Sequence, residues 1–134
     1  MEPNIFSLEM AVRDYECDLQ GVVNNAVYQN YLEHARHEYL KSIGIDFAAL
    51  AAEGINLVVV RVELDYKLSL TSGDRFVVEV RPERISPVRI GFHQDIYRLP
   101  DRKLVIRGLV TGTALNAKGR PQLPKALTEL LERT

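Results

Sequence analysis

Hydrophobic residues change their spacing near residue 25 and recur at every third or fourth position from there to residue 42. The stripe consists of Tyr28, Leu32, Ala35 and Tyr39, and it is widened by Val27 and Tyr31. This spacing places them on one face of an α-helix, so the pattern predicts a helix over residues 25–42. Asn24 or Asn25 can cap its start, because an Asn side chain accepts a hydrogen bond from an otherwise unpaired first-turn N–H.

Two shorter segments flank this helix. Residues 5–13 mix apolar and polar positions without Gly or Pro and predict a first strand, which residues 14–21 interrupt. On the other side, Gly44 suits the end of the long helix, and Asp46 starts a short second helix that ends at Gly54.

After the second helix, apolar residues alternate with polar ones. The longest alternation runs through residues 58–70 and consists of Val58, Val60, Val62, Leu64, Tyr66, Leu68 and Leu70. Because successive side chains of a strand point to opposite faces, the alternation predicts a long strand with one buried face.

Three further strands are predicted over residues 75–85, 88–96 and 103–115, separated by turns that contain Ser, Gly, Pro and Asp. In the last strand Gly108 and Gly112 indicate a bulge, a bend or the close approach of another backbone. The final residues, with Pro124 near their start and leucines at helical spacing, predict a short terminal helix.

This order of elements predicts a single α+β domain over residues 1–134. Short turns favour antiparallel pairing, and one unusually apolar helix beside one sheet favours two layers in which the sheet wraps the helix. The chain of 134 residues is long enough to bury a core without disulfides or metal ions. Long strands with free edges further predict a homo-oligomer.

The amino-acid composition limits the kinds of partner that the protein is expected to bind. The 17 Lys and Arg residues nearly balance 18 Asp and Glu residues, so no overall field recruits nucleic acid or an anionic membrane. The single cysteine excludes an internal disulfide and fits a reducing compartment. The first residues do not resemble a secretion signal, and no apolar run approaches the length of a bilayer. We therefore expect a soluble, cytoplasmic protein that binds neither nucleic acid nor membrane.

The polar loop before the long helix holds the candidate chemistry. Asp18 lies shortly before the helix start, where free backbone N–H groups carry partial positive charge. Spacing alone favours an ordinary turn or capping role for this residue. In the catalytic alternative, Asp18 acts as a base or nucleophile on a carbonyl carbon, while the N–H of Val23, Asn24 or Asn25 binds the developing oxyanion.

Other polar residues near Asp18 give weaker evidence for a catalytic or metal-binding role. Cys17 has no neighbouring His to generate a thiolate and is expected to be a packing residue. His34 and His37 lie three residues apart without a third ligand, so no metal site is predicted. Glu33 is expected to pair with Arg36 or His37 on the helix surface, or alternatively to point at the same reaction centre as Asp18.

Basic residues gather near the turns of the later strands. They are Arg81, Arg84, Arg89, Arg98, Arg102, Lys103, Lys118 and Arg120. Such residues are usually solvated surface, but they can pair with the phosphates of a nucleotide-tailed acyl carrier. The sequence contains no G-x-G-x-x-G, Walker or G-x-S-x-G motif, so dinucleotide, NTP and serine-hydrolase chemistry have no support.

Residues 14–40, DYECDLQGVVNNAVYQNYLEHARHEYL, resemble the active-site segment of hotdog-fold acyl thioesterases of the 4-hydroxybenzoyl-CoA thioesterase type. The match runs from Asp18 through Gly21-Val22-Val23 to Glu33-x-Ala35-Arg36. The wording GVVNNAVY is shared with the subgroup that includes plant acyl-lipid thioesterases. The order of elements agrees over nearly the whole chain.

This resemblance implies a hotdog fold, an antiparallel sheet wrapped around one long central helix, and hydrolysis of coenzyme A or acyl-carrier-protein thioesters without cofactor or metal. It implies Asp18 as the catalytic carboxylate and the backbone N–H of Asn25, next to Asn24 and Val23, as the group that polarises the carbonyl. The substrate-binding residues expected are Gly21, Val22, Tyr28, Arg84 and Arg89. Sheets paired edge to edge, active sites at the subunit interface and a tetramer are implied as well.

One departure concerns the helix start. Many bacterial relatives read G-V-V-Y-H where this chain reads Gly21-Val22-Val23-Asn24-Asn25, so their His is absent here and their short-chain acyl-CoA preference does not transfer directly. The H-G-G and His-Phe-Pro signatures of other hotdog branches are absent too. Two alternatives stay open: a non-catalytic acyl-CoA or acyl-carrier-protein binding module, and a hydratase or dehydratase of acyl thioesters.

Overall fold

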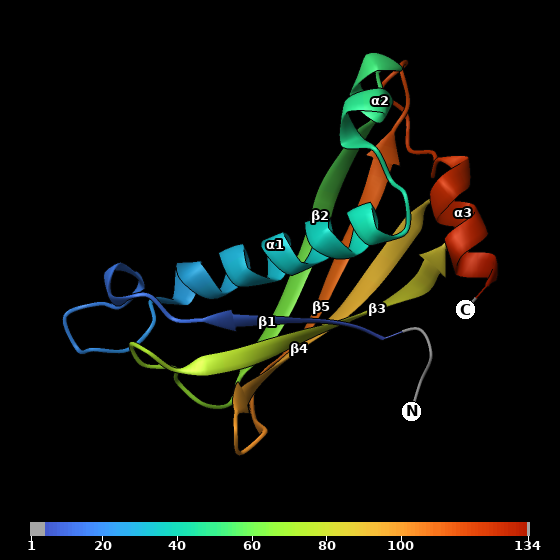
Figure 1. Ribbon diagram of the computed structural model, residues 1–134. Coiled ribbons are helices and arrows are strands. Elements are labelled where there is room, and N and C mark those ends of the chain that lie inside the picture. The colour runs from blue at the N-terminus through green and yellow to red at the C-terminus, as the bar shows by residue number, and fades with distance from the viewer. Residues whose placement is uncertain (1–4, 134) are drawn as a thin grey trace.

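The computed structural model describes residues 5–133, and its elements follow the predicted order (Figure 1). The helices are the 3-10 turn η1 (Asp14–Glu16), α1 (Asn25–Ser42), α2 (Phe47–Ala52) and α3 (Lys125–Glu132). The strands are β1 (Phe6–Ala11), β2 (Asn56–Tyr66), β3 (Arg75–Ser86), β4 (Arg89–Leu99) and β5 (Lys103–Leu115). The long helix and the terminal helix after Pro124 are therefore confirmed.

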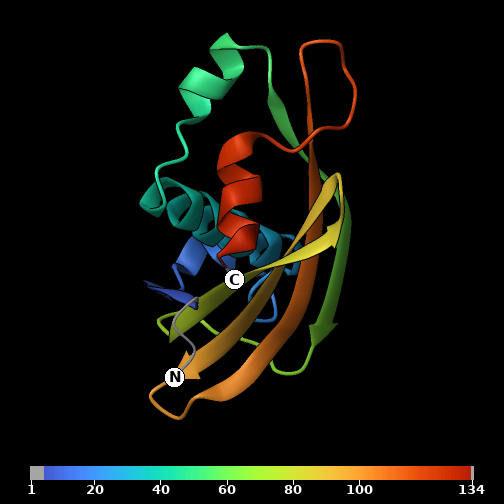
Figure 2. The same ribbon diagram turned by 90° about the vertical axis from the view of Figure 1, so that its right-hand side faces the viewer.

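The strands form one antiparallel sheet in the order β1-β3-β4-β5-β2. Short turns join β3 to β4 and β4 to β5, and these strands pair as predicted. The same expectation for β2 and β3 is wrong, because β2 pairs with β5 at the edge of the sheet. The sheet curves around α1, and Figure 2 shows α1 and α3 on its concave side. Within residues 5–133 no helix is long and apolar enough to cross a membrane.

The core lies between α1 and the concave face of the sheet. The buried residues of α1 are Tyr28, Tyr31, Leu32, Ala35, Tyr39 and Leu40. Opposite them, strand residues at alternate positions have no exposed surface: Phe76, Val78, Val80, Ile96 and Ile106. Burying each large apolar side chain stabilises the fold by about 1.5–3 kcal/mol, so this layer supplies most of the cohesion between helix and sheet.

Strand β2 departs from the prediction in its length and phase. It ends at Tyr66 rather than at Leu70, because the next two N–H groups both donate to Val105 O and the ladder stops there. A bulge at Val60 also breaks the alternation, since the register shifts between Val59 and Arg61. Before the bulge, the odd-numbered residues of β2 lie on the side of the sheet that faces α1, and after it the even-numbered residues do. The single uninterrupted buried face predicted over residues 58–70 is therefore wrong.

The apolar side chains of β2 are also not buried. Val59, Val60, Val62 and Tyr66 are between 39% and 50% exposed. The reason is their position at the edge of the sheet, where β5 is the only strand among the described residues that pairs with β2. An alternating pattern identifies an apolar face but not the element that covers it.

Gly108 and Gly112 lie where other backbone groups come close. A Cβ at Gly108 would lie 3.0 Å from Gln94 O and 2.8 Å from Leu64 Cδ2, and one at Gly112 would lie 3.1 Å from Val58 O. The close approach that these glycines indicate is therefore confirmed.

Candidate active site

The loop between β1 and α1 forms a tight turn around Asp18. The Asp18 N–H donates to Val22 O (2.9 Å), the Gly21 N–H donates to Asp18 O (3.0 Å), and the Gln20 N–H donates to Asp18 Oδ1 (2.8 Å). Gly21 has a φ of +79°, a conformation that glycine adopts without steric cost. The side chain of Asp18 is exposed, and its Oδ2 accepts no hydrogen bond within residues 5–133.

Backbone pairing fixes this turn to the segment before β3. Cys17 pairs with Val23, Val22 pairs with Thr71, and the Val23 N–H donates to Leu70 O (2.9 Å). A hydrogen bond from the Ser72 hydroxyl to Asp14 adds a second contact between the two segments. These contacts hold the loop in a defined position against the segment before β3.

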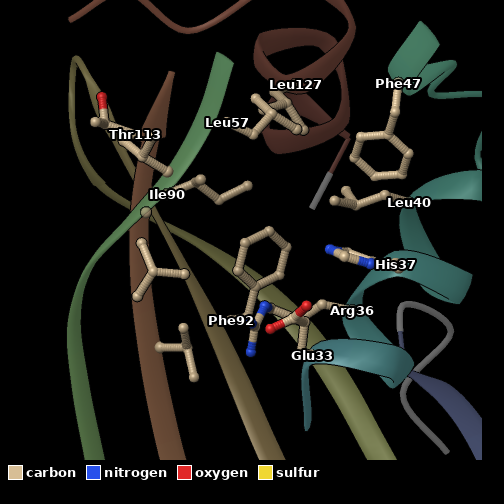
Figure 3. Close-up of a pocket in the computed structure, with 14 residues that line it drawn as sticks. Glu33, Arg36, His37, Leu40, Phe47, Leu57, Ile90, Phe92, Thr113 and Leu127 are labelled. Atoms are coloured by element: carbon tan, nitrogen blue, oxygen red, sulfur yellow. The ribbon is translucent and has the colours of Figure 1, made fainter. Parts of the chain in front are cut away.

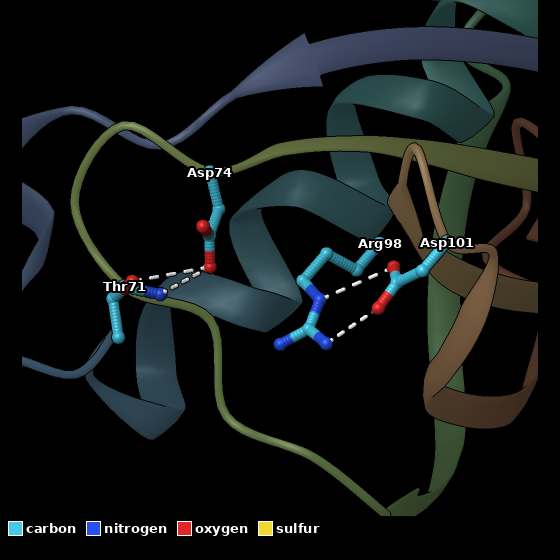
Figure 4. Close-up of polar contacts among 4 residues, drawn as sticks. All are labelled: Thr71, Asp74, Arg98 and Asp101. Atoms are coloured by element: carbon cyan, nitrogen blue, oxygen red, sulfur yellow. Dashed lines mark hydrogen bonds and ion pairs between the residues drawn. The ribbon is translucent and has the colours of Figure 1, made fainter.

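The segment on which the loop rests is itself closed by polar contacts (Figure 4). The Thr71 N–H and hydroxyl both donate to Asp74 Oδ2, at 2.9 and 3.2 Å. On the adjacent β4–β5 turn, Arg98 donates to both carboxylate oxygens of Asp101, at 3.3 and 2.6 Å, and lowers the pKa of that carboxyl. Arg98 is thus engaged within the protein.

The three candidate oxyanion donors differ in availability. The Val23 N–H is bound to Leu70 O, and the Asn24 N–H donates to Glu16 O (3.1 Å). The Asn24 side chain caps α1, since its Oδ1 accepts from the Ala26 N–H (2.9 Å). Asn25 is the first residue of the helix, so its N–H has no intrahelical acceptor, and it makes no other hydrogen bond within the described chain. The Asn25 N–H is therefore the free donor at the positive end of the helix.

Tyr28 is a core residue, only 2% exposed. Its hydroxyl accepts the Leu70 N–H (2.9 Å), and its ring packs edge-on against Tyr31 and Tyr66. It supports the segment that holds Val23, so its contribution to a site is through the shape of that segment.

Arg84 and Arg89 flank the β3–β4 turn. In Figure 1 this turn lies at the opposite end of the sheet from the loop between β1 and α1. The Asp18 loop adjoins the start of β3, because Ala11 pairs with Arg75. Arg84 lies nine residues further along, roughly 30 Å at 3.3 Å per residue. One chain therefore does not bring these arginines together with Asp18.

Cys17 is half-buried and packs against the core, which confirms its predicted packing role. Burial, reinforced by the carboxylates of Asp14 and Asp18, raises the pKa of the thiol. A higher pKa leaves less thiolate at neutral pH, which disfavours Cys17 as a nucleophile.

A cavity of about 250 Å³ lies between α1 and the sheet (Figure 3). Most of its wall is apolar and comes from Leu40, Phe47, Leu57, Ile90, Phe92, Val110 and Leu127. Phe47, Leu57 and Leu127 gather at one end, and Glu33 and Arg36 of α1 lie at the other. Its size and lining suit an apolar ligand with a polar end.

Arg36 contacts the sheet rather than its helical neighbour. Its Nη1 donates to Gln94 Oε1 (3.0 Å), and Gln94 Nε2 donates to Leu32 O (2.8 Å). Burial lowers the pKa of Arg36. The expected ion pair of Glu33 with Arg36 or His37 does not form between these described residues, and the fully buried Gln94 offers the Arg36 guanidinium an acceptor inside the fold.

His37 lies beside the cavity, with its ring centroid 5.3 Å from that of Phe47, and His34 is exposed. In the described part of the chain, no three His, Cys, Asp or Glu side chains converge as metal ligands. The wall residues Phe47, Phe92 and Leu127 were not anticipated from the sequence. They come from three elements far apart in the chain, and apolar spacing within each element marks only burial.

Comparison with known proteins identifies the family of the chain. Residues 12–132 match the model of the thioesterase-like superfamily. The chain is 44% identical over 114 residues to the chloroplastic acyl-acyl carrier protein thioesterase ATL2 of Arabidopsis thaliana. The aligned residues make up 85% of this chain and 61% of that protein. It is 40% identical over 121 residues to ATL3 of the same plant, with 90% and 64% covered. The chain therefore spans somewhat over three fifths of the length of these relatives.

A solved structure shows the same fold. The crystal structure of a 1,4-dihydroxy-2-naphthoyl-CoA thioesterase from Synechocystis has a TM-score of 0.88 to this chain at 19% identity, covering 95% of both chains. The hotdog architecture expected from the sequence, with α1 as its central helix, is thereby confirmed.

Proposed function

We propose, for a chain that belongs to the thioesterase-like superfamily, that it hydrolyses acyl thioesters of coenzyme A or acyl carrier protein to a free acid and a thiol. The observation that carries the proposal is the position of Asp18, with an unbonded carboxylate oxygen, next to a helix start whose Asn25 N–H is free. Asn25 binds the thioester oxygen, and Asp18 supplies the base or nucleophile. The single cysteine fits the reducing cytoplasm, which we propose as the compartment.

Two routes are compatible with this arrangement. In the first, Asp18 Oδ2 attacks the carbonyl carbon, the thiolate leaves, and water hydrolyses the resulting mixed anhydride. In the second, Asp18 takes a proton from a water molecule that attacks the same carbon. A single turnover in ¹⁸O-labelled water separates them, because only the first route can place the label in the Asp18 carboxylate.

The acyl group is proposed to occupy the cavity between α1 and the sheet. Within one chain this cavity is displaced from the Asp18 loop: Arg36 follows Asn25 by eleven residues, roughly 16 Å along the helix at 1.5 Å per residue. The cavity instead adjoins the start of β2, at Leu57, while the end of β2 leads through Leu70 to the loop.

A second copy resolves this separation. If β2 pairs with β2 of another chain in antiparallel fashion, the start of one strand lies beside the end of the other, and the cavity of one chain adjoins the partner's Asp18. The exposed apolar residues Val59, Val62 and Tyr66 support such pairing. The pairing also moves Arg89, which lies opposite Thr113 at the cavity end of the sheet, toward the partner's loop, where it can meet carrier phosphates. We therefore propose a homo-oligomer of such pairs, as a tetramer, with active sites at the interface.

The test is a panel of acyl-CoA and acyl-carrier-protein thioesters scored by thiol release. We expect turnover by the wild type and a loss of roughly 10³-fold in Asp18→Asn, with unchanged melting temperature and assembly. Asp46→Asn is the matched control, because Asp46 caps α2 away from the Asp18 loop and Asn caps equally well. Wild-type protein that binds these thioesters without releasing thiol would instead be a binding module, and hydration of crotonyl-CoA would indicate a lyase.

A further inference from the structure

Glu16 joins three segments of the chain at a position two residues before Asp18. Its Oε1 accepts the Arg13 N–H (2.8 Å) at the loop entrance and the Tyr31 hydroxyl (2.7 Å) from α1. Its carbonyl oxygen accepts the Asn24 N–H (3.1 Å) at the loop exit. A single residue therefore links both ends of the loop to each other and to the helix.

Tyr31 brings its hydroxyl to this carboxylate from a rigid position. Its side chain is 3% exposed, and its ring lies 4.7 Å from that of Phe76 in β3 and 6.1 Å from that of Tyr28. Burial and the hydrogen bond to Glu16 raise the pKa of Tyr31 well above its ordinary value. The hydroxyl consequently stays protonated and donates to Glu16 across the range in which enzymes are assayed.

The other hydrogen bonds of the loop have different partners. Those around Asp18 close the turn on itself, and those of Val22 and Val23 attach it to the segment before β3. Apart from the Asn24 cap, the Tyr31–Glu16 bond is the side-chain hydrogen bond by which α1 holds the loop in residues 5–133. It thus fixes the turn that carries Asp18 relative to the helix whose first N–H belongs to Asn25.

We propose that Glu16 and Tyr31 are positioning residues that set the distance and orientation between the Asp18 carboxylate and the Asn25 N–H. The inference rests on the proposed function, in which those two groups act on one thioester carbonyl. Neither Glu16 nor Tyr31 touches the substrate in this scheme. A displacement of about 1 Å between reacting groups can cost 10²-fold in rate, so loss of this bond lowers kcat more than it changes KM.

The test compares variants that break the bond with one that keeps it. Tyr31→Phe and Glu16→Ala are expected to lower kcat by about 10- to 100-fold, with KM changed less than about threefold. Glu16→Gln retains an acceptor oxygen of the same shape and is expected to recover most of kcat. The double variant Glu16→Ala/Tyr31→Phe should be no slower than Glu16→Ala, since Glu16→Ala already removes the acceptor of the bond that Tyr31→Phe breaks.

Tyr39→Phe is the matched control, because Tyr39 is a buried tyrosine of the same helix, packed on Phe6 and remote from the loop. Tyr31→Phe with wild-type kcat, or with a loss no larger than that of Tyr39→Phe, would overturn the inference and leave the thioesterase proposal intact. If Tyr31→Phe does not fold, the Glu16→Ala and Glu16→Gln pair decides in the same way. Wild-type protein inactive on every thioester would overturn the proposed function and this inference with it.

Discussion

The loop before α1 and the edge strand β2 differ in how far one chain completes them. In the loop, backbone groups from Cys17 to Asn24 bond to the loop itself, to the segment before β3 or to Glu16, and one N–H at the helix start is left free. Along β2, no strand among the described residues pairs with the outer side, and Val59, Val60, Val62 and Tyr66 stay between 39% and 50% exposed.

In the proposed function, this difference separates the catalytic groups, which one chain positions, from the acyl-binding cavity, which two chains complete. The relation of Asp18 to Asn25 is set by local hydrogen bonds and needs no partner. The wall of the cavity that adjoins β2 is open in one chain, so its closure depends on whatever covers the edge strand. Changes at β2 should therefore remove activity through assembly, whereas changes in the loop should leave assembly intact.

Outside the Asp18 loop, the largest expected effect comes from a charge on the half-exposed apolar face of β2. Val62→Lys should convert the oligomer to a folded monomer, because a lysine there would have to be desolvated on pairing. Turnover should fall by about 10²-fold or more, since Asp18 and the cavity of the partner chain no longer meet. Light scattering coupled to gel filtration and thiol release measure the two effects on one preparation.

Asp65→Lys is the control for this variant, because it introduces a lysine on the same strand at a position that is already polar and exposed. It should keep both assembly and turnover. An oligomeric, active Val62→Lys protein would mean that β2 is not the interface. A monomer that retains full turnover would mean that the site is complete within one chain, and the contrast between loop and edge would disappear.

A smaller effect is expected at the end of the cavity formed by Phe47, Leu57 and Leu127. Phe47→Ala removes a ring from the wall contributed by α2 and should shift the preferred acyl chain toward longer lengths. Each additional buried methylene contributes about 0.8 kcal/mol, so two more should raise kcat/KM for the longer substrate by roughly tenfold relative to wild type. The measurement is kcat/KM across a series of linear acyl thioesters.

Leu50→Ala controls for general damage to α2, because Leu50 packs against the core without lining the cavity. It should leave the chain-length profile unchanged. A profile that stays the same in Phe47→Ala, or that shifts equally in both variants, would show that this cavity does not hold the acyl chain.

The elements that could be predicted are those whose signal is local. The helical stripe of Tyr28, Leu32, Ala35 and Tyr39 predicted α1, and short turns predicted the pairing of β3 with β4 and of β4 with β5 but not the place of β2 beside β5. The bulge at Val60 could not be predicted, because an extra residue in one strand is defined only by the register with β5. For the same reason the alternation in β2 could not reveal that its apolar face is uncovered.

In the candidate site, too, features with a local sequence signal could be predicted and features set by tertiary contacts could not. Spacing alone predicted an ordinary turn role for Asp18, and the hydrogen bonds of such a turn are present. The catalytic role of Asp18 was inferred from resemblance and is a proposal. That Val23 and Asn24 use their N–H groups elsewhere could not be anticipated, since their acceptors, Leu70 and Glu16, are chosen by the tertiary fold. Arg36 likewise turned to Gln94, a partner 58 residues away, rather than to Glu33.

The smallest expected effect is at Cys17, which lies next to Asp18 but should take no part in the reaction. Cys17→Ala should retain kcat within about twofold, because it removes only a half-buried packing group from a loop fixed by backbone bonds. The raised pKa gives a second readout: alkylation by iodoacetamide consumes thiolate, so at pH 8 Cys17 should react more slowly than glutathione and accelerate only as the pH rises further. Rapid alkylation at neutral pH together with an inactive, folded Cys17→Ala variant would transfer the nucleophile from Asp18 to Cys17. The nucleophile of the loop would then be a thiol, and only the proposed role of the Asn25 N–H as oxyanion donor would be retained.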